Sequence, residues 1–175
     1  MFTKADIEKY FVAEKAESLL FLAIGIGAII LSVIFYFGLK TNFYKGAAIP
    51  LVLIGLLLGI VGYTVYKRSD GDRVRNTYSY DMNPGDLKNK ELPRMETVMK
   101  NFVVYRYIEI ALAVIGVFLF FYFQSNEEKI FWKGFGVTLA VMAVVALSAD
   151  YFAEKRGQVY SDGLKSFTAH SGANK

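Results

Sequence analysis

The sequence predicts an all-α integral membrane protein in which four transmembrane helices form two hairpin repeats of the same orientation. Hydrophobic residues make up 54% of the 175-residue chain and charged residues 21%, whereas soluble domains contain about 45–50% and about 25%. The apolar residues gather in runs of roughly 20, the length that a helix needs to cross the hydrocarbon core of a bilayer. The second half of the chain also repeats the pattern of the first.

The first two spans are predicted at residues 18–39 and 47–66. Residues 18–39 carry no charge and, at about 1.5 Å per residue, are long enough for a hydrocarbon core of about 30 Å. This run is too long for the apolar part of a signal peptide, so we expect it to be retained. Pro50 falls in the first turn of the second span, where its missing N–H would have no helical partner anyway.

The third and fourth spans are predicted at residues 107–123 and 131–152. Glu109 lies just inside the third span, and Lys133 and Asp150 lie near the two ends of the fourth. Backbone in lipid must satisfy its own hydrogen bonds, and these segments lack the alternation of barrel strands. We therefore expect all four spans to be helices.

The distribution of basic residues predicts the orientation. Of the 20 lysines and arginines, 16 lie before the first span, between the second and third, or after the fourth. The other four lie in the two short connections. Because basic residues concentrate on the cytoplasmic side, both termini and the middle segment are expected in the cytoplasm. From the small size of the chain, the membrane is expected to be the inner membrane of a bacterium.

An internal repeat relates the two halves. Residues 43–68 and 131–156 share Phe, Lys, Gly, Leu, Tyr, Lys and Arg at a constant offset, and residues 7–15 resemble residues 98–106. Two spans return the chain to its starting side, so the repeats point the same way and their pseudo-two-fold axis follows the membrane normal. The alternative is that shared membrane constraints alone make the two hairpins similar.

Amphipathic helices are expected to extend the spans on the cytoplasmic side. Thr3 and Asp6 have the spacing of a helix cap, and the apolar residues that follow line one face. Pro93 opens a similar segment before the third span. The fourth span is expected to continue as a helix to Phe167.

The remaining segments are expected to be irregular. Residues 69–92 contain Asp-Gly and Asn-Pro-Gly steps, which predict a polar cytoplasmic linker. Residues 168–175, which include the only histidine, His170, are expected to form a frayed tail. The two repeats would then comprise residues 1–68 and 93–167.

No catalytic pattern is found. The sequence contains no metal-ligand spacing, phosphate loop or nucleophile motif, and it has no cysteine. We therefore expect no enzymatic activity, no cofactor and no bound metal. Nucleic-acid binding is not expected either, because acids are mixed among the bases and the membrane topology explains the bases.

Four ionisable residues near the cytoplasmic span ends form a candidate interfacial ion network: Glu17, Arg106, Glu109 and Asp150. Charged groups inside a bilayer are costly and often functional. Their positions near the interface favour a structural network of paired charges. Asp150 is expected to form an ion pair or a water-mediated contact with Arg106. The alternative is that the acids bind a cation or relay a proton.

Small residues mark candidate packing faces. The second span contains Gly55 and Gly59, and the first contains Ala23 and Gly27, each pair four residues apart. Such spacing lets helix backbones approach closely, either within one chain or between two copies.

These features predict a structural, regulatory or accessory membrane protein that associates with itself or with a larger membrane complex. The alternative is a small oligomeric transporter or channel whose path is lined by Glu17, Glu109 and Asp150. Apart from the lipid bilayer, the sequence identifies no partner.

Overall fold

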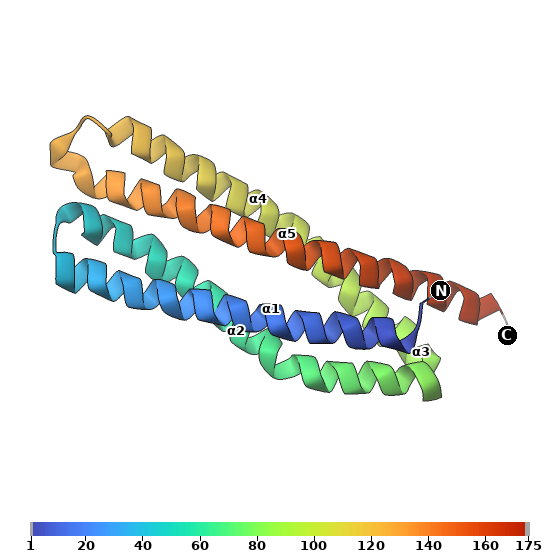
Figure 1. Cartoon of the computed structure of the whole chain (residues 1–175). Helices are drawn as coiled ribbons and strands as arrows, with labels where there is room; N and C mark the ends of the chain where they lie inside the picture. Colours follow the sequence, from blue (N-terminus) through green and yellow to red (C-terminus); the bar gives the residue numbers. More distant parts are fainter. Residues whose placement is uncertain (1, 174–175) are drawn as a thin grey trace.

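The computed structural model describes residues 2–173, with side chains as far as Ala169, and this part of the chain is all-helical (Figure 1). Four of its helices are long and apolar enough to cross a membrane. The elements in chain order are α1 (Lys4–Val33), the π-helical η1 (Ile34–Leu39), α2 (Asn42–Met82), α3 (Pro84–Asp86), the π-helical η2 (Leu87–Glu91), α4 (Leu92–Phe123), the 3₁₀ turn η3 (Glu127–Lys129) and α5 (Ile130–Ala173).

The long helices form two hairpins that lie side by side (Figure 1). The first hairpin turns at Lys40, whose φ of 56° is left-handed, and at Thr41, whose hydroxyl accepts a hydrogen bond from the backbone N–H of Tyr44 at 3.4 Å. The second hairpin turns through η3. Both turns lie at one end of the molecule, the turn end, and both chain termini lie at the other, the termini end.

The helices pack in a row and not in a closed ring. Helix α1 packs on α2, α2 packs on α5, and α5 packs on α4, while α1 and α5 touch only sparsely. Helix α4 packs extensively against α5 alone among the long helices. One side of α4 is therefore left open along its apolar stretch, beyond the start of the helix, where Met95 is buried in a core cluster with α1 and α5.

The expected linker at residues 69–92 is largely helical, which corrects the sequence interpretation. Helix α2 runs unbroken past Arg68 to Met82, and the chain turns only at Asn83. The buried residues of this stretch are polar and recur at helical spacing: Ser69, Asp72, Asn76 and Ser79. Because the buried stripe is polar, a search for apolar periodicity does not find it.

Two further boundaries differ from expectation. Helix α2 begins at Asn42, so Pro50 lies two turns inside it instead of in its first turn. Proline is tolerated inside membrane-type helices where neighbouring groups take over the freed carbonyl. Helix α5 continues to Ala173, so residues 168–173 are helical and not frayed. The end of the expected tail, residues 174–175, and the His170 side chain lie outside the described residues.

Close backbone contacts join α1 to α2. A Cβ on Gly25 would lie 2.6 Å from the Gly55 carbonyl oxygen and 2.6 Å from the Gly59 nitrogen. Gly55 and Gly59 therefore lie at the helix contact, but the partner on α1 is Gly25. The expected α1 residues face elsewhere, since Ala23 is exposed and a Cβ on Gly27 would meet nothing within 4 Å.

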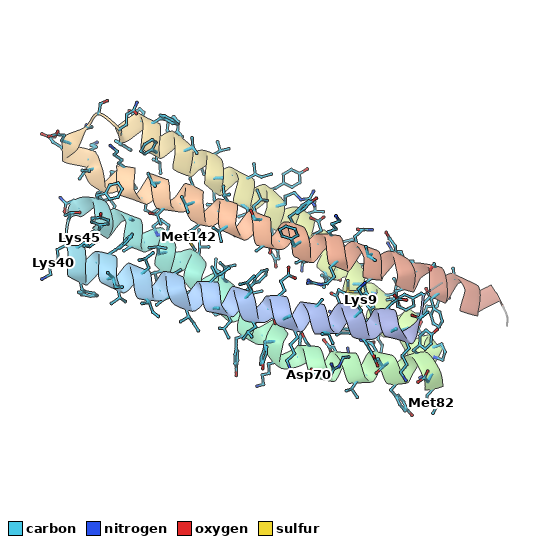
Figure 2. All side chains as sticks on the ribbon, in the orientation of Figure 1. Lys9, Lys40, Lys45, Asp70, Met82 and Met142 are labelled. Carbon is cyan, nitrogen blue, oxygen red and sulfur yellow. The ribbon has the colours of Figure 1, made fainter. Side chains whose placement is uncertain are left out.

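A reciprocal contact joins the two hairpins near the turn end. A Cβ on Gly46 of α2 would collide with the Phe131 carbonyl oxygen of α5, and a Cβ on Gly134 of α5 would collide with the Phe43 carbonyl oxygen of α2. Below this crossing, α2 and α5 share an apolar core with α1 that includes Leu51, Ile54, Leu58, Leu139, Met142 and Ala146. Figure 2 labels Met142 on α5, on the side toward the first hairpin.

Candidate functional site

Buried polar side chains gather toward the termini end in two groups. The first, here called the Glu91 cluster, is built from Tyr10, Glu14, Ser69, Glu91, Arg94 and Tyr160. The second, here called the acid pocket, lies between α4 and α5 around Glu109 and Asp150. Both groups lie where the apolar runs give way to charged helix.

Glu91 is at the centre of the first cluster and is 1% exposed. Its Oε2 accepts a hydrogen bond from Arg94 Nε at 2.9 Å, and its Oε1 accepts one from Arg94 Nη2 at 2.6 Å. The hydroxyl of Tyr160 donates to Oε1 at 3.2 Å. Burial opposes ionisation of Arg94, but the hydrogen bonds and charge of Glu91 outweigh it and raise the pKa of Arg94. The hydrogen bond from Tyr160 ties Glu91, at the start of α4, to α5.

Glu14 performs a similar role between α1 and α2. It is 7% exposed and accepts hydrogen bonds from the Tyr10 hydroxyl at 3.2 Å and from the Ser69 hydroxyl at 3.1 Å. The guanidinium of Arg68 lies 3.5 Å away. Every donor around Glu14 therefore comes from α1 or from the stretch of α2 at the end of its apolar run.

Two tyrosines join these carboxylates. The rings of Tyr10 and Tyr160 stack with centroids 4.1 Å apart and an interplanar angle of 7°. Burial raises the pKa of both hydroxyls above the ordinary value of 10, reinforced by Glu14 beside Tyr10 and by Glu91 beside Tyr160. The tyrosines stay neutral hydrogen-bond donors, and the cluster locks the two hairpins together.

The acid pocket is a cavity of about 460 Å³ between α4 and α5. Glu109 from α4 and Asp150 from α5 both line it. Two carboxyl groups on one cavity inside the predicted spans are the residue type from which intramembrane proton and cation sites are built.

The four predicted network residues are divided among three contacts. Arg106 forms its ion pair with Glu154 and not with Asp150, although Arg106 and Asp150 line the same cavity. Because α4 and α5 run antiparallel, Arg106, one turn before Glu109, meets Glu154, one turn after Asp150. Asp150 and Glu154 are four residues apart, so they lie on the same face of α5. This spacing is the feature of the sequence that makes Glu154 a second candidate partner for Arg106.

Glu17 pairs with a different helix. Its carboxylate forms an ion pair with Arg156, which joins α1 to α5. Sequence reasoning did not single out Arg156, Glu154 or Glu91. Glu91 lay in the expected linker, where only its three-residue spacing to Arg94 pointed to an ion pair.

The side chains at these two sites supply carboxyl groups, paired charges and tyrosine hydroxyls. Within the described part of the chain, no group of three or more His, Cys, Asp or Glu side chains is arranged to hold a metal ion. Comparison with protein families, with curated proteins and with solved structures finds no match to this chain.

Proposed function

We propose that the chain is a four-span protein of a bacterial inner membrane that acts as a structural, regulatory or accessory subunit, through association with itself or with a larger membrane complex. Both termini and the Glu91 cluster lie in the cytoplasm in this proposal. The support is the distribution of the 20 basic residues. Four lie in or close to the two hairpin turns, and the other 16 belong to the N-terminal, middle and C-terminal segments of the sequence.

The open face of α4 carries this proposal. Only 6% of its most apolar stretch is buried, compared with 28% to 33% for the other three long helices. Exposed apolar side chains recur along it at Val114, Phe118 and Tyr122, which are 61–69% exposed. Lipid alone could cover this face, but a helix whose apolar stretch packs extensively against only one other long helix is also free to pack against another subunit.

The association is tested by mass measurement after purification in mild detergent. Val114 on α4 and Leu57 on α2 are 63% and 64% exposed, so they form a matched pair. We expect a particle heavier than the 19.7 kDa monomer, which Val114→Trp dissociates and Leu57→Trp leaves intact. A monomeric wild-type chain without any co-purifying protein would contradict the proposal.

The proposed topology is tested separately with engineered cysteines, since the chain has none. Asn126 lies in the second hairpin turn and Gln158 lies on the terminal part of α5. In intact cells, a membrane-impermeant maleimide should label Asn126→Cys and spare Gln158→Cys until the cells are opened. Labelling in the opposite order would reverse the orientation.

The contact between the hairpins supports the proposed repeat. Phe43 and Gly46 occupy the positions of Phe131 and Gly134 at the constant offset, and each phenylalanine carbonyl faces the glycine of the other hairpin. Two-fold symmetry produces such reciprocal contacts. The repeats would be related by a pseudo-two-fold axis along the membrane normal.

A small transporter or channel is the second candidate, and the acid pocket is the observation that favours it. Two carboxyl groups that line one cavity are the residue type of an intramembrane proton relay. In liposomes, Asp150→Asn should abolish pH-dependent flux if the pair transports protons. If the pair is structural, wild type and variant should both show only background flux, and the variant should melt at a different temperature.

A further inference from the structure

A second cavity, of about 580 Å³, lies between α1 and α5 at the termini end, and we call it the α1–α5 groove. It exists because α1 and α5 each pack along a hairpin partner and touch one another only sparsely. Its volume falls within the range of about 300–1,000 Å³ that is usual for small-molecule sites. Figure 2 labels Lys9 between the ribbons of α1 and α5, where the groove runs.

The floor and one wall of the groove are apolar. The stacked rings of Tyr10 and Tyr160 form part of the floor. On α5, Phe152 and Val159 line the groove while remaining 64% and 72% exposed. Together with Lys155 they follow one face of the helix, since their spacing is three and four residues. An apolar group bound in the groove would cover them.

The rim of the groove is positively charged. Lys9 from α1 and Lys155 from α5 line it, and neither ammonium lies within 4 Å of a carboxylate of the described residues. The acid that lines the groove, Asp6, accepts hydrogen bonds from the hydroxyl and backbone N–H of Thr3 at 2.7 and 2.8 Å. These bonds, and to a smaller degree the charge of Lys9, hold the pKa of Asp6 below its usual range, so Asp6 is ionised and offsets part of the Lys9 charge. Lys9 and Lys155 together still outweigh Asp6, and the rim attracts an anion.

We propose that the α1–α5 groove binds an anionic phospholipid of the cytoplasmic leaflet, with its phosphate between Lys9 and Lys155 and its headgroup on the tyrosine floor. This proposal rests on the proposed membrane insertion. Phe152 ends the predicted fourth span, so the groove opens at the predicted membrane surface. Lys155 is three residues further on, or about 4.5 Å along the helix, which is the depth of the headgroup layer. The acyl chains would leave past Phe152 into the bilayer.

The test measures lipid retention by native mass spectrometry of the purified full chain in detergent micelles. Phosphatidylglycerol is compared with phosphatidylcholine on wild type, on Lys9→Gln/Lys155→Gln and on the control Lys67→Gln/Lys100→Gln. The control lysines are also exposed and unpaired among the described residues, and they remove the same charge from α2 and α4. We expect wild type and control to prefer phosphatidylglycerol, and the groove variant to bind it about 30-fold more weakly, because each lysine near an anionic surface contributes about 1 kcal/mol.

Three results would overturn the proposal. Equal weakening in the groove variant and the control would mean diffuse attraction to the whole basic surface. Displacement of the phospholipid by millimolar glycerol phosphate would mean that the groove takes a soluble phosphate. Unchanged binding in Val159→Glu, which places a carboxylate in the groove and leaves both lysines in place, would locate the lipid elsewhere. An unchanged elution volume and melting temperature would show that each variant is folded.

The proposed function and this site can fail independently. Release of the chain from membranes by alkaline carbonate would contradict membrane insertion, whatever the lipid preference in micelles. Retention of the chain in carbonate-washed membranes, with equal binding of both phospholipids, would contradict the groove proposal alone.

Discussion

Glu91 is the least exposed carboxylate in the described part of the chain, and Arg94 is its main counter-charge, with the Arg75 guanidinium 4.0 Å from Oε2. Arg94 supplies two hydrogen bonds and Tyr160 supplies a third. Removing one partner of a buried ion pair leaves the other charge uncompensated, which is much worse than never having buried the pair. The stability of the termini end should therefore depend strongly on this one side chain.

Glu91→Gln should lower the free energy of unfolding by about 3 kcal/mol, at the lower end of the values for broken buried pairs, because the Arg94 side chain is partly exposed. Glu96→Gln removes the same charge from an exposed position on α4 and should change stability by less than about 0.5 kcal/mol. Thermal unfolding in detergent, followed by circular dichroism, compares the two. Equal melting temperatures would show that the Glu91 pair does not support the fold.

The two stacked tyrosines predict a loss of stability at alkaline pH. Burial raises the pKa of Tyr10 and Tyr160 in the folded chain, whereas both titrate near 10 when unfolded. Above pH 10 the unfolded chain loses protons that the folded chain keeps, so stability is complete below that pH and falls as pH rises further. Melting temperatures between pH 8 and pH 11.5 should show this fall.

Tyr10→Phe should make that alkaline fall shallower, while Tyr78→Phe, at a 64% exposed position, should leave its slope unchanged. Tyr10→Phe also loses the hydrogen bond to Glu14, so its melting temperature at pH 8 should be lower. The slope, and not the starting value, is the quantity compared. Parallel curves for all three proteins would mean that the buried tyrosines are not responsible.

At the scale of the elements, apolar runs predicted the four long helices because burial in lipid requires a continuous apolar surface. The same reasoning failed for residues 69–82, where α2 is held by polar contacts. Ser69 donates to Glu14, and Asp70 pairs with Lys15 at 2.5 Å. Such contacts depend on which helix lies opposite, and a sequence read alone does not supply that neighbour.

The acids of the candidate site show the same division. Hydropathy located Glu17, Glu109 and Asp150 near the ends of the spans, because charge interrupts an apolar run. It did not predict their partners, because those depend on the relative register of antiparallel helices. A shift of one turn between α4 and α5 decides whether Arg106 meets Asp150 or Glu154.

Gly71 tests whether the end of α2 is helix or linker. It lies in the helix interior, and a Cβ there would meet nothing within 4 Å. Gly71→Ala should therefore raise the free energy of unfolding by about 0.5–1 kcal/mol, because alanine is the better helix former. Gly71→Pro should lower it by about 3 kcal/mol through loss of a helical hydrogen bond and a backbone clash. Chemical denaturation measures both, and a flexible linker would tolerate either change.

For the whole molecule, the two hairpins are similar but not superimposable throughout. Helices α2 and α5 meet through reciprocal contacts, as a two-fold axis requires. Their hairpin partners are placed differently, since Gly25 of α1 meets Gly55 and Gly59, whereas Gly116 of α4 meets Gly136 and Ala140. At the constant offset of the repeat, Gly136 and Ala140 correspond to positions seven residues before Gly55 and Gly59. The contact between α4 and α5 therefore lies about two helical turns nearer to its hairpin turn than the contact between α1 and α2 does. Any two-fold relation therefore centres on α2 and α5.

The reciprocal glycines provide the last prediction. An added methyl group at Gly46 or Gly134 would collide with backbone, which cannot rotate away as a side chain can. Each of Gly46→Ala and Gly134→Ala should lower the free energy of unfolding by about 1–3 kcal/mol, and by similar amounts because their surroundings are equivalent. The double variant should lose less free energy of unfolding than the sum of the two single losses, because two helices that one methyl group has already forced apart accommodate the second.

Gly27→Ala, with open space around its Cβ, is the control. Denaturant unfolding measures all four, and a large loss at one glycine with none at the other would refute the two-fold equivalence of the hairpins.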